Sequence, residues 1–135
     1  MTEKKILLIE DDSRLREGLL VLLKSELNLD ADWAGSTKSA LRLLTNGAYD
    51  VVVSDNKLPR FGDLGDKTEY HQGLELLKWM RQEEKYRETP FIMHTGDDLP
   101  EVRQQVEELR GIFCPKGQLN PSLFSCIEEA MLAHT

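Results

Sequence analysis

Five short, mostly apolar runs divide this sequence at regular intervals. They lie at residues 6–9, 31–34, 51–53, 91–93 and 112–114, and the second, around Trp33, is the weakest. Runs of this length are typical of strands that are buried on both faces of a parallel sheet. Because parallel strands need a long crossover between them, this pattern limits the chain to a small number of folds.

The segments between the runs have the spacing of amphipathic helices. After the first run, Leu15, Leu19, Leu22 and Leu23 recur at i, i+4, i+7 and i+8. The later stripes are Ala40, Leu41 and Leu44; Leu74, Leu77 and Met80; Val102, Val106 and Leu109; and Leu123, Ile127, Ala130 and Met131. This (βα)5 order, with right-handed crossovers, predicts an α/β three-layer sandwich around a parallel five-stranded sheet. The absence of repeats and linkers indicates a single domain over residues 1–135.

Composition excludes several classes of protein. The chain has 17 basic and 24 acidic side chains, a formal charge of −7, so direct nucleic-acid binding through clustered Lys and Arg is not expected. No stretch approaches the ~20 apolar residues of a membrane-spanning helix, so we expect no membrane contact. Two cysteines, Cys114 and Cys126, are too few for a disulfide scaffold and suit a reducing compartment. We therefore expect a cytoplasmic protein.

Polar residues follow four of the apolar runs. Glu10, Asp11 and Asp12 come after the first, Asp55 after the third, Thr95 and Gly96 after the fourth, and Lys116 after the fifth. Parallel strands bring such positions to one edge of the sheet, where ligands bind. Clustered carboxylates need a cation, and oxygen ligands suit Mg²⁺, or Mn²⁺ in its place. A hydroxyl and an ammonium suit phosphoryl oxygens. The set predicts a phosphorylated carboxylate, or a bound phosphate, assisted by the metal.

Each of these residues also has an ordinary structural explanation. Asp12 and Ser13 can cap the first helix, where acidic side chains favour the helix dipole. Asp55 can be a turn residue, Thr95 a strand-end hydroxyl and Lys116 a solvated side chain. The functional interpretation depends on all of these positions meeting at one edge of the sheet.

Four segments together resemble the receiver domain of response regulators in two-component signalling, the family of the chemotaxis regulator. They are Ile-Leu-Leu-Ile-Glu-Asp-Asp at 6–12, Tyr-Asp-Val-Val-Val-Ser-Asp-Asn-Lys-Leu-Pro at 49–59, Pro-Phe-Ile-Met-His-Thr-Gly at 90–96, and Phe-Cys-Pro-Lys at 113–116. The resemblance extends from Lys4 to about Leu132. It implies a flavodoxin-like sheet with the strand order 2-1-3-4-5.

The resemblance also implies a role for each polar residue. Asp55 corresponds to the phosphoacceptor, which takes a phosphoryl group from a phosphohistidine. Asp11 corresponds to the acid that binds Mg²⁺ directly, together with Asp55 and the backbone carbonyl of Lys57. Glu10 corresponds to the acid that reaches the metal through water.

The remaining roles concern the phosphoryl group and the switch. Thr95, followed by Gly96, corresponds to the hydroxyl that moves to a phosphoryl oxygen, and Lys116 to the lysine that pairs with another of its oxygens. Phe113 occupies the place of the aromatic switch; a plain edge-strand aromatic is the alternative. Lys57 and Asp97 flank the path of attacking water in this family, so they are candidates for tuning hydrolysis, either as a pair or as independent surface charges.

Two features depart from the family pattern. Pro115 precedes Lys116 and Gly117 follows it, whereas the family usually has proline after the lysine. Residues 60–72 form a long segment without periodicity, and Gly73, the candidate start of the third helix, lies 18 positions past Asp55. We expect a structureless loop there. It either restricts access of a partner or of water, or is a tolerated surface insertion.

The sequence thus favours a phosphorylation-switched signalling domain rather than an enzyme. The resemblance implies a histidine kinase or histidine phosphotransfer protein as donor. It also implies an output surface on the fourth helix, fifth strand and fifth helix, around residues 102–130, with a phosphorylation-dependent dimer as one use of it. The alternatives are a small Mg²⁺-dependent phosphohydrolase that uses Asp55, or a receiver-like scaffold that is never phosphorylated. Lys57 disfavours the phosphohydrolase, which commonly has a second acid at that position.

Overall fold

A computed structural model describes residues 4–62, 66–96, 98–117 and 122–132. Its centre is a parallel sheet in the order β2-β1-β3-β6-β7. These strands are β1 (Ile6–Ile9), β2 (Ala31–Ala34), β3 (Val51–Ser54), β6 (Phe91–Thr95) and β7 (Ile112–Pro115). Counted without the two short strands β4 and β5, this is the predicted order 2-1-3-4-5, so the flavodoxin-like fold is confirmed.

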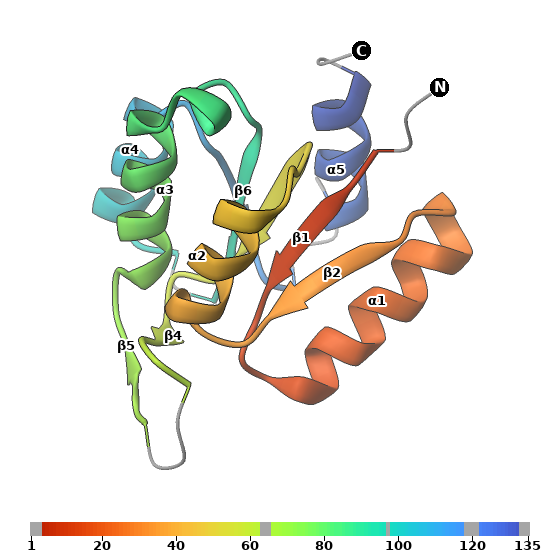
Figure 1. The fold of residues 1–135 in the computed structure, drawn as a ribbon, viewed down its shortest axis with the longest axis horizontal. Helices are drawn as coiled ribbons and strands as arrows, with labels where there is room; N and C mark the ends of the chain where they lie inside the picture. Colours follow the sequence, from red (N-terminus) through yellow and green to blue (C-terminus); the bar gives the residue numbers. More distant parts are fainter. Residues whose placement is uncertain (1–3, 63–65, 97, 118–121, 133–135) are drawn as a thin grey trace.

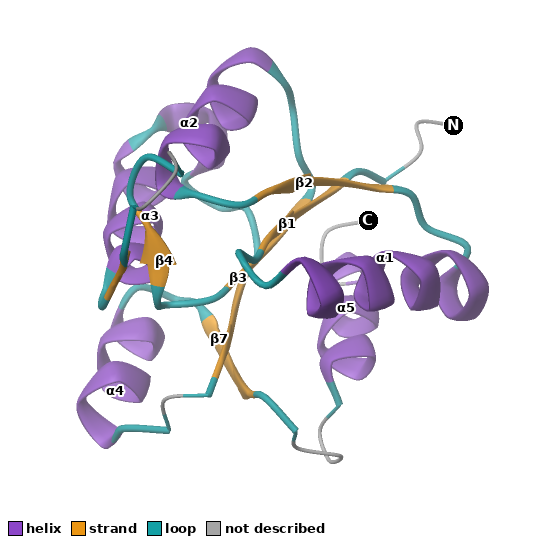
Figure 2. Cartoon of the chain, turned by 90° about the horizontal axis from the view of Figure 1, so that it is seen from below, coloured by secondary structure: helices purple, strands orange, loops and turns teal. Residues whose placement is uncertain are grey.

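Helices cover both faces of the sheet (Figure 1). They are α1 (Ser13–Leu27), α2 (Thr37–Asn46), α3 (Gln72–Gln82), α4 (Pro100–Glu108) and α5 (Leu123–Leu132), with a 3-10 turn at Glu84–Tyr86. Seen from below, α1 and α5 lie on one side, and α2, α3 and α4 on the other (Figure 2). The structure thus has the three layers that the alternating pattern predicts. No helix among the described residues is long and apolar enough to cross a membrane.

Each face of the sheet has its own apolar core, because successive side chains of a strand point to opposite faces. Leu7 and Ile9 pack with Val52 in the core beneath α2, α3 and α4. Ile6 and Leu8 pack in the core beneath α1 and α5. All of these strand residues are at most 2% exposed, which explains why the runs are almost continuously apolar.

Local signals explain where the helices begin. The carboxylate of Asp12 accepts hydrogen bonds from the amides of Arg14 and Leu15. Asp12 therefore caps α1, which is the ordinary structural role that the sequence allows for it. Ser36 caps α2 in the same way. Pro115 lies in β7, an edge strand of the sheet, where the missing amide donor is tolerated.

The segment predicted to be structureless contains a short hairpin. β4 (Leu58–Pro59) pairs antiparallel with β5 (Thr68–Glu69). The expectation of a loop without structure over 60–72 is therefore wrong at β5, and α3 already begins at Gln72. Figure 1 shows the hairpin extending beyond the carboxyl edge of the sheet, on the side of α2 and α3. Strands of two residues are too short to give a periodic signal in the sequence.

Candidate functional site

The carboxyl ends of the strands bring the predicted polar residues together. β1 pairs with β3 so that Ile9 lies opposite Ser54, which makes Glu10 and Asp55 neighbours. β6 pairs with β7 so that Thr95 lies opposite Pro115, and the amide of Lys116 donates to the carbonyl of Thr95 at 2.8 Å. The geometry therefore joins residues that are up to 106 positions apart in the sequence, from Glu10 to Lys116.

Three carboxylates at this edge form a set that could hold a metal ion. Ligand oxygens of Glu10, Asp11 and Asp55 all lie within 4.8 Å of one another. Glu10 and Asp55 are 2% and 8% exposed, and Asp11 is partly exposed. Mg²⁺ takes one or two carboxylates and keeps several waters, so a set that is open on the Asp11 side suits it. The residues present therefore fit the metal that the sequence predicts.

Lys116 neutralises two of these carboxylates. Its Nζ lies 2.7 Å from Oδ2 of Asp55 and 2.8 Å from Oε1 of Glu10, and the side chain is 26% exposed. Burial raises the pKa of the Glu10 carboxyl, and the hydrogen bond from Lys116 only partly opposes this effect. Burial also disfavours the ammonium, but the two carboxylates outweigh it and raise the pKa of Lys116. Lys116 thus stays charged and already counters the negative charge of the site.

The other oxygen of Asp55 is held by the backbone. Its Oδ1 accepts a hydrogen bond from the amide of Asn56 at 2.7 Å and from that of Lys57 at 3.3 Å. Two amides and one ammonium therefore fix the carboxylate in one orientation. A carboxylate fixed in this way, 8% exposed and beside a metal-binding set, has the position of an acceptor that meets an incoming group from one direction.

The candidates for the switch are buried next to the site. Thr95 is 1% exposed at the end of β6, and Gly96 directly after it is exposed. Phe113 on β7 is 8% exposed, and the guanidinium of Arg103 from α4 lies 4.6 Å from the centre of its ring. Phe113 thus lies between the sheet and α4. The ring contacts a charged residue of the expected output surface, and the choice between an aromatic switch and a plain edge-strand aromatic stays a prediction.

The two candidates for tuning hydrolysis differ in what the structure describes. The Lys57 side chain is exposed, and its Nζ lies 5.0 Å from the ring centre of Tyr70. Asp97 lies outside the described residues. The side chain of Lys57 is therefore directed to the hairpin, and its pairing with Asp97 stays a prediction.

Sequence reasoning did not identify Asn56 and Gly73 as parts of the site. Asn56 is fully buried, and its Oδ1 and backbone carbonyl accept hydrogen bonds from the amides of Leu74 and Gly73 in the first turn of α3. It therefore caps α3 from the segment directly after β3, next to Asp55. A Cβ on Gly73 would lie 2.9 Å from Cα of Asn56, so a glycine is needed for this close approach. The only sequence signal was this glycine at the start of a helix.

His94 is also part of this edge. It lies on β6 with 8% exposure. Burial, together with the charge of Lys116, lowers the pKa of His94 to about 4. The imidazole is therefore neutral at physiological pH. His71, in contrast, is exposed at the start of α3, so the two histidines form no metal pair.

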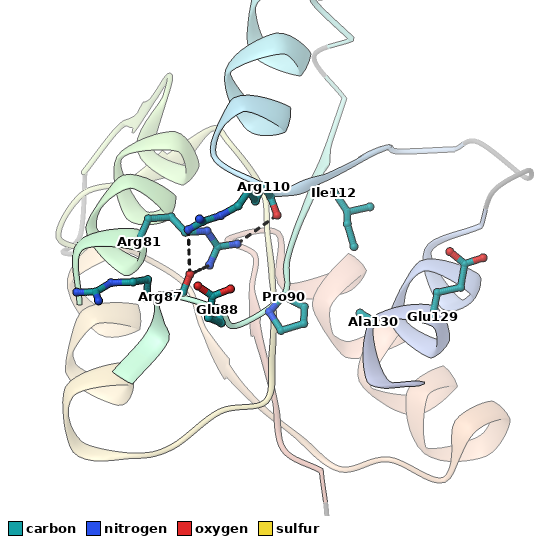
Figure 3. Close-up of a pocket in the computed structure, with 8 residues that line it drawn as sticks. All are labelled: Arg81, Arg87, Glu88, Pro90, Arg110, Ile112, Glu129 and Ala130. Atoms are coloured by element: carbon teal, nitrogen blue, oxygen red, sulfur yellow. Dashed lines mark hydrogen bonds between the residues drawn. The ribbon is translucent and has the colours of Figure 1, made fainter. Parts of the chain in front are cut away.

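A cavity of about 350 Å³ lies at the opposite, amino edge of the sheet (Figure 3). Its lining residues are Arg81, Arg87, Glu88, Pro90, Arg110, Ile112, Glu129 and Ala130. The Arg81 guanidinium donates to five backbone carbonyls, those of Tyr86, Arg87, Thr89, Leu109 and Arg110. Arg81 thus ties the turn before β6 to the turn before β7, and its donors are already used within the chain.

Comparisons with known proteins agree with this geometry. The sequence profile of the response regulator receiver domain matches residues 6–111. The transcriptional regulatory protein QseB of Haemophilus influenzae is 32% identical over 99 residues, which cover 73% of this chain and 39% of that protein. Chemotaxis protein CheY-3 of Vibrio cholerae is 30% identical over 93 residues, which cover 69% of this chain and 64% of that protein. The chain thus spans less than two thirds of the length of either relative.

Solved structures lead to the same family. The non-phosphorylated HemR receiver domain of Leptospira biflexa superposes with a TM-score of 0.76 at 27% identity, and covers 96% of this chain and 94% of that one. CheY4 of Vibrio cholerae, at 21% identity and a TM-score of 0.74, shares the fold. With the strand order, the acidic edge and the profile match all in agreement, the chain belongs to the response regulator receiver domain family of two-component signalling.

Proposed function

We propose that the chain receives a phosphoryl group on Asp55 from a phosphohistidine and thereby switches a protein-binding surface. The observation that carries this proposal is the setting of the Asp55 carboxylate, which is fixed by two amides and Lys116 beside the metal-binding set of Glu10 and Asp11. Transfer to such a carboxylate depends mainly on positioning and on charge neutralisation, which a small domain can provide.

The transfer forms one bond and breaks one. An oxygen of the Asp55 carboxylate bonds to phosphorus, the phosphorus–nitrogen bond of the phosphohistidine breaks, and the imidazole leaves with that electron pair. Receiver domains bind Mg²⁺ at an acidic pocket. Here Asp11, Asp55 and the carbonyl of Lys57 would hold the ion, with Glu10 acting through water. When bound, it neutralises charge on the transferring group.

The chain's own residues then stabilise the product and detect it. Lys116 already contacts Asp55, so its ammonium is placed to pair with one phosphoryl oxygen. We expect the hydroxyl of Thr95, with the backbone at Gly96, to take another. Hydrogen bonds to charged groups contribute roughly 1.5–3 kcal/mol each, so two of them approach the ~5.5 kcal/mol that inverts a 1:99 equilibrium. Movement of Thr95 would leave space for Phe113 to rotate.

Receiver domains interact with histidine kinases and with output proteins. For this chain we propose a histidine kinase or histidine phosphotransfer protein as the donor, and an output surface formed by α4, β7 and α5, where Phe113 and Arg103 lie. A phosphorylation-dependent dimer through that surface is one form of output. Cys114 and Cys126 are both buried free thiols, which is in keeping with a reducing compartment such as the cytoplasm.

Incubation with acetyl phosphate and Mg²⁺, followed by intact mass measurement, tests the proposal. Wild type should gain the mass of one phosphoryl group and lose it slowly, whereas Asp55→Asn should gain none. Asp12→Asn is a matched control, because Asp12 belongs to the same acidic triplet but caps α1, a role in which asparagine is equally good. It should be phosphorylated like wild type.

The same experiment separates the alternatives. A phosphohydrolase that uses Asp55 would turn over many phosphate esters per chain, with phosphate release that depends on Asp55. A scaffold that is never phosphorylated would show no mass gain with Mg²⁺ or Mn²⁺. Either result, or a mass gain that persists in Asp55→Asn, would contradict the proposed function.

A further inference from the structure

We propose that Tyr70 of the β4–β5 hairpin is a positioning residue that holds the Lys57 side chain as a wall beside Asp55, and that this wall slows hydrolysis of the acyl phosphate. This inference rests on the proposed function, because it concerns the lifetime of the phosphorylated state. The β4–β5 hairpin would thus regulate the lifetime of the acyl phosphate through one contact between two exposed side chains, Lys57 and Tyr70.

The strand register of the hairpin places the two side chains opposite each other. β4 pairs with β5 so that Leu58 faces Glu69 and Pro59 faces Thr68. One further step in this antiparallel register brings Lys57 opposite Tyr70, and side chains that lie opposite each other share one face of a hairpin. The distance of 5.0 Å from the Lys57 Nζ to the Tyr70 ring centre is within the range of a cation–π interaction.

The hairpin is anchored, so Tyr70 is held at a defined place. Arg60 forms an ion pair with Glu69 across the two strands at 3.2 Å. The carbonyl of Arg60 also accepts a hydrogen bond from the amide of Lys38 in the first turn of α2. On the outer side of the hairpin, Asp66 accepts from the amides of Phe61 and Gly62, each at 2.7 Å. The bond from Lys38 fixes the hairpin to α2, and the other contacts hold the two sides of the hairpin together.

Lys57 connects this hairpin to the phosphoacceptor. Its amide donates to Oδ1 of Asp55, and Leu58 directly after it is fully buried in the core. The backbone of Lys57 is therefore fixed at the site, and only its side chain is free to choose a partner. A side chain held by Tyr70 runs in one direction from the amide that contacts Asp55 to the ring on the hairpin, whereas a released side chain moves through solvent.

Hydrolysis of the acyl phosphate needs a water molecule at the phosphorus. The water oxygen bonds to phosphorus, the bond from phosphorus to the Asp55 oxygen breaks, and a proton passes to solvent as phosphate leaves. A fixed wall on one side reduces the routes by which water reaches the phosphorus. Loss of the wall should therefore accelerate hydrolysis, by about 2- to 5-fold if the held state has the ~0.5–1 kcal/mol of an exposed cation–π pair.

The test measures how long the acyl phosphate survives. The full chain and its variants are phosphorylated with phosphoramidate and Mg²⁺, the donor is removed, and the phosphorylated fraction is followed by intact mass. Tyr70→Leu and Lys57→Met should each shorten the half-life about 2- to 5-fold. The double variant should be no faster than either single one, because both remove the same contact. Tyr70→Phe keeps the ring and should retain the wild-type half-life.

Two matched controls lie on the same hairpin. Phe61 and Tyr70 are both 55% exposed, so Phe61→Leu removes a comparable aromatic ring that does not contact Lys57. Lys67→Met removes another exposed lysine of the hairpin. Both controls should decay like wild type. Unchanged or longer half-lives in Tyr70→Leu, or additive effects in the double variant, would overturn the inference while phosphorylation itself is retained. Failure of wild type to become phosphorylated would instead overturn the proposed function.

Discussion

The two edges of the sheet each hold a partly buried cation, but the partners of the two cations differ in kind. At the carboxyl edge, Lys116 is bound by the carboxylates of Glu10 and Asp55. At the amino edge, Arg81 is bound by five backbone carbonyls, of which those of Arg87 and Arg110 are drawn in Figure 3. Carboxylates can exchange an ammonium for a metal or share it with a phosphoryl group, whereas carbonyls of turns stay where the fold puts them. One edge is therefore open to chemistry, and the other fixes the framework.

Removing Arg81 should have the largest effect on stability. Arg81→Met keeps the length of the side chain but removes the guanidinium from five carbonyls. Those of Tyr86 and Arg87 keep another donor, the amide of Thr89 and the guanidinium of Arg110. The other three lose their Arg81 bond, so the free energy of unfolding should fall by about 3–4 kcal/mol. Denaturation with urea measures it. Mg²⁺ should not restore the loss, because the carboxylates that could hold a metal ion lie at the other edge. Arg87→Met, an exposed arginine at the same cavity, is the control and should stay within ~0.5 kcal/mol of wild type. If Mg²⁺ restored the unfolding free energy of Arg81→Met, the two edges of the sheet would not act independently, and the comparison would be wrong.

The second largest effect on the free energy of unfolding should come from lowering the pH, which protonates His94 at the carboxyl edge. Its pKa of about 4 in the folded state lies below the 6.5 of an unfolded chain, so the unfolded state binds the extra proton between these values. The stability due to neutral His94 is thus complete above pH 6.5 and is lost as the pH falls toward 4. We expect a loss of about 2–3 kcal/mol over this range.

The matched variant is His94→Leu, and the measured quantity is the difference between its unfolding free energy and that of wild type at each pH. Subtraction removes the pH dependence that the two proteins share and leaves that of His94, on which the charges of Lys116 and Asp55 act. Wild type should lose stability relative to the variant as the pH falls. Parallel pH profiles would show that His94 is not the group that titrates.

Removing Lys116 should have the smallest effect, and only this one should depend on Mg²⁺. Without metal, Lys116→Met leaves the buried Glu10 facing Asp55, which should cost about 1–2 kcal/mol of unfolding free energy. Saturating Mg²⁺ should stabilise the variant more than it stabilises wild type, because no ammonium competes for the carboxylates. Lys78→Met, an exposed lysine on α3, is the control. An equal response to Mg²⁺ in all three proteins would contradict the exchange of cations.

The sequence was sufficient for the sheet and the acidic edge because both depend on short-range patterns. Each strand of the parallel sheet contains a mostly apolar run, and Glu10, Asp55 and Lys116 each follow within two positions of the end of such a run. Once the strands are parallel, the edge assembles from the topology alone. The family resemblance added the strand order, which the pattern of runs does not determine.

The hairpin and the cap of α3 could not be predicted for the opposite reason. The strands of the hairpin are two residues long, and the register that places Lys57 against Tyr70 arises only when they pair. Asn56 caps a helix that begins 16 positions later, at Gln72, and helix-start signals are read from residues next to the helix. Contacts of this kind depend on the folded chain rather than on its local sequence.

The bonds from Gly73 and Leu74 to Asn56 have a consequence for how this domain tolerates its insertion. These bonds join the start of α3 to Asn56, directly after β3, so the residues between Asn56 and Gly73 form a closed loop. The entropic cost of closing such a loop grows only slowly with its length. The residues between β4 and α3 can thus be lengthened, shortened or exchanged for a different segment while Asp55 and α3 keep their places. New specificities can therefore arise at this position without changes to the rest of the fold.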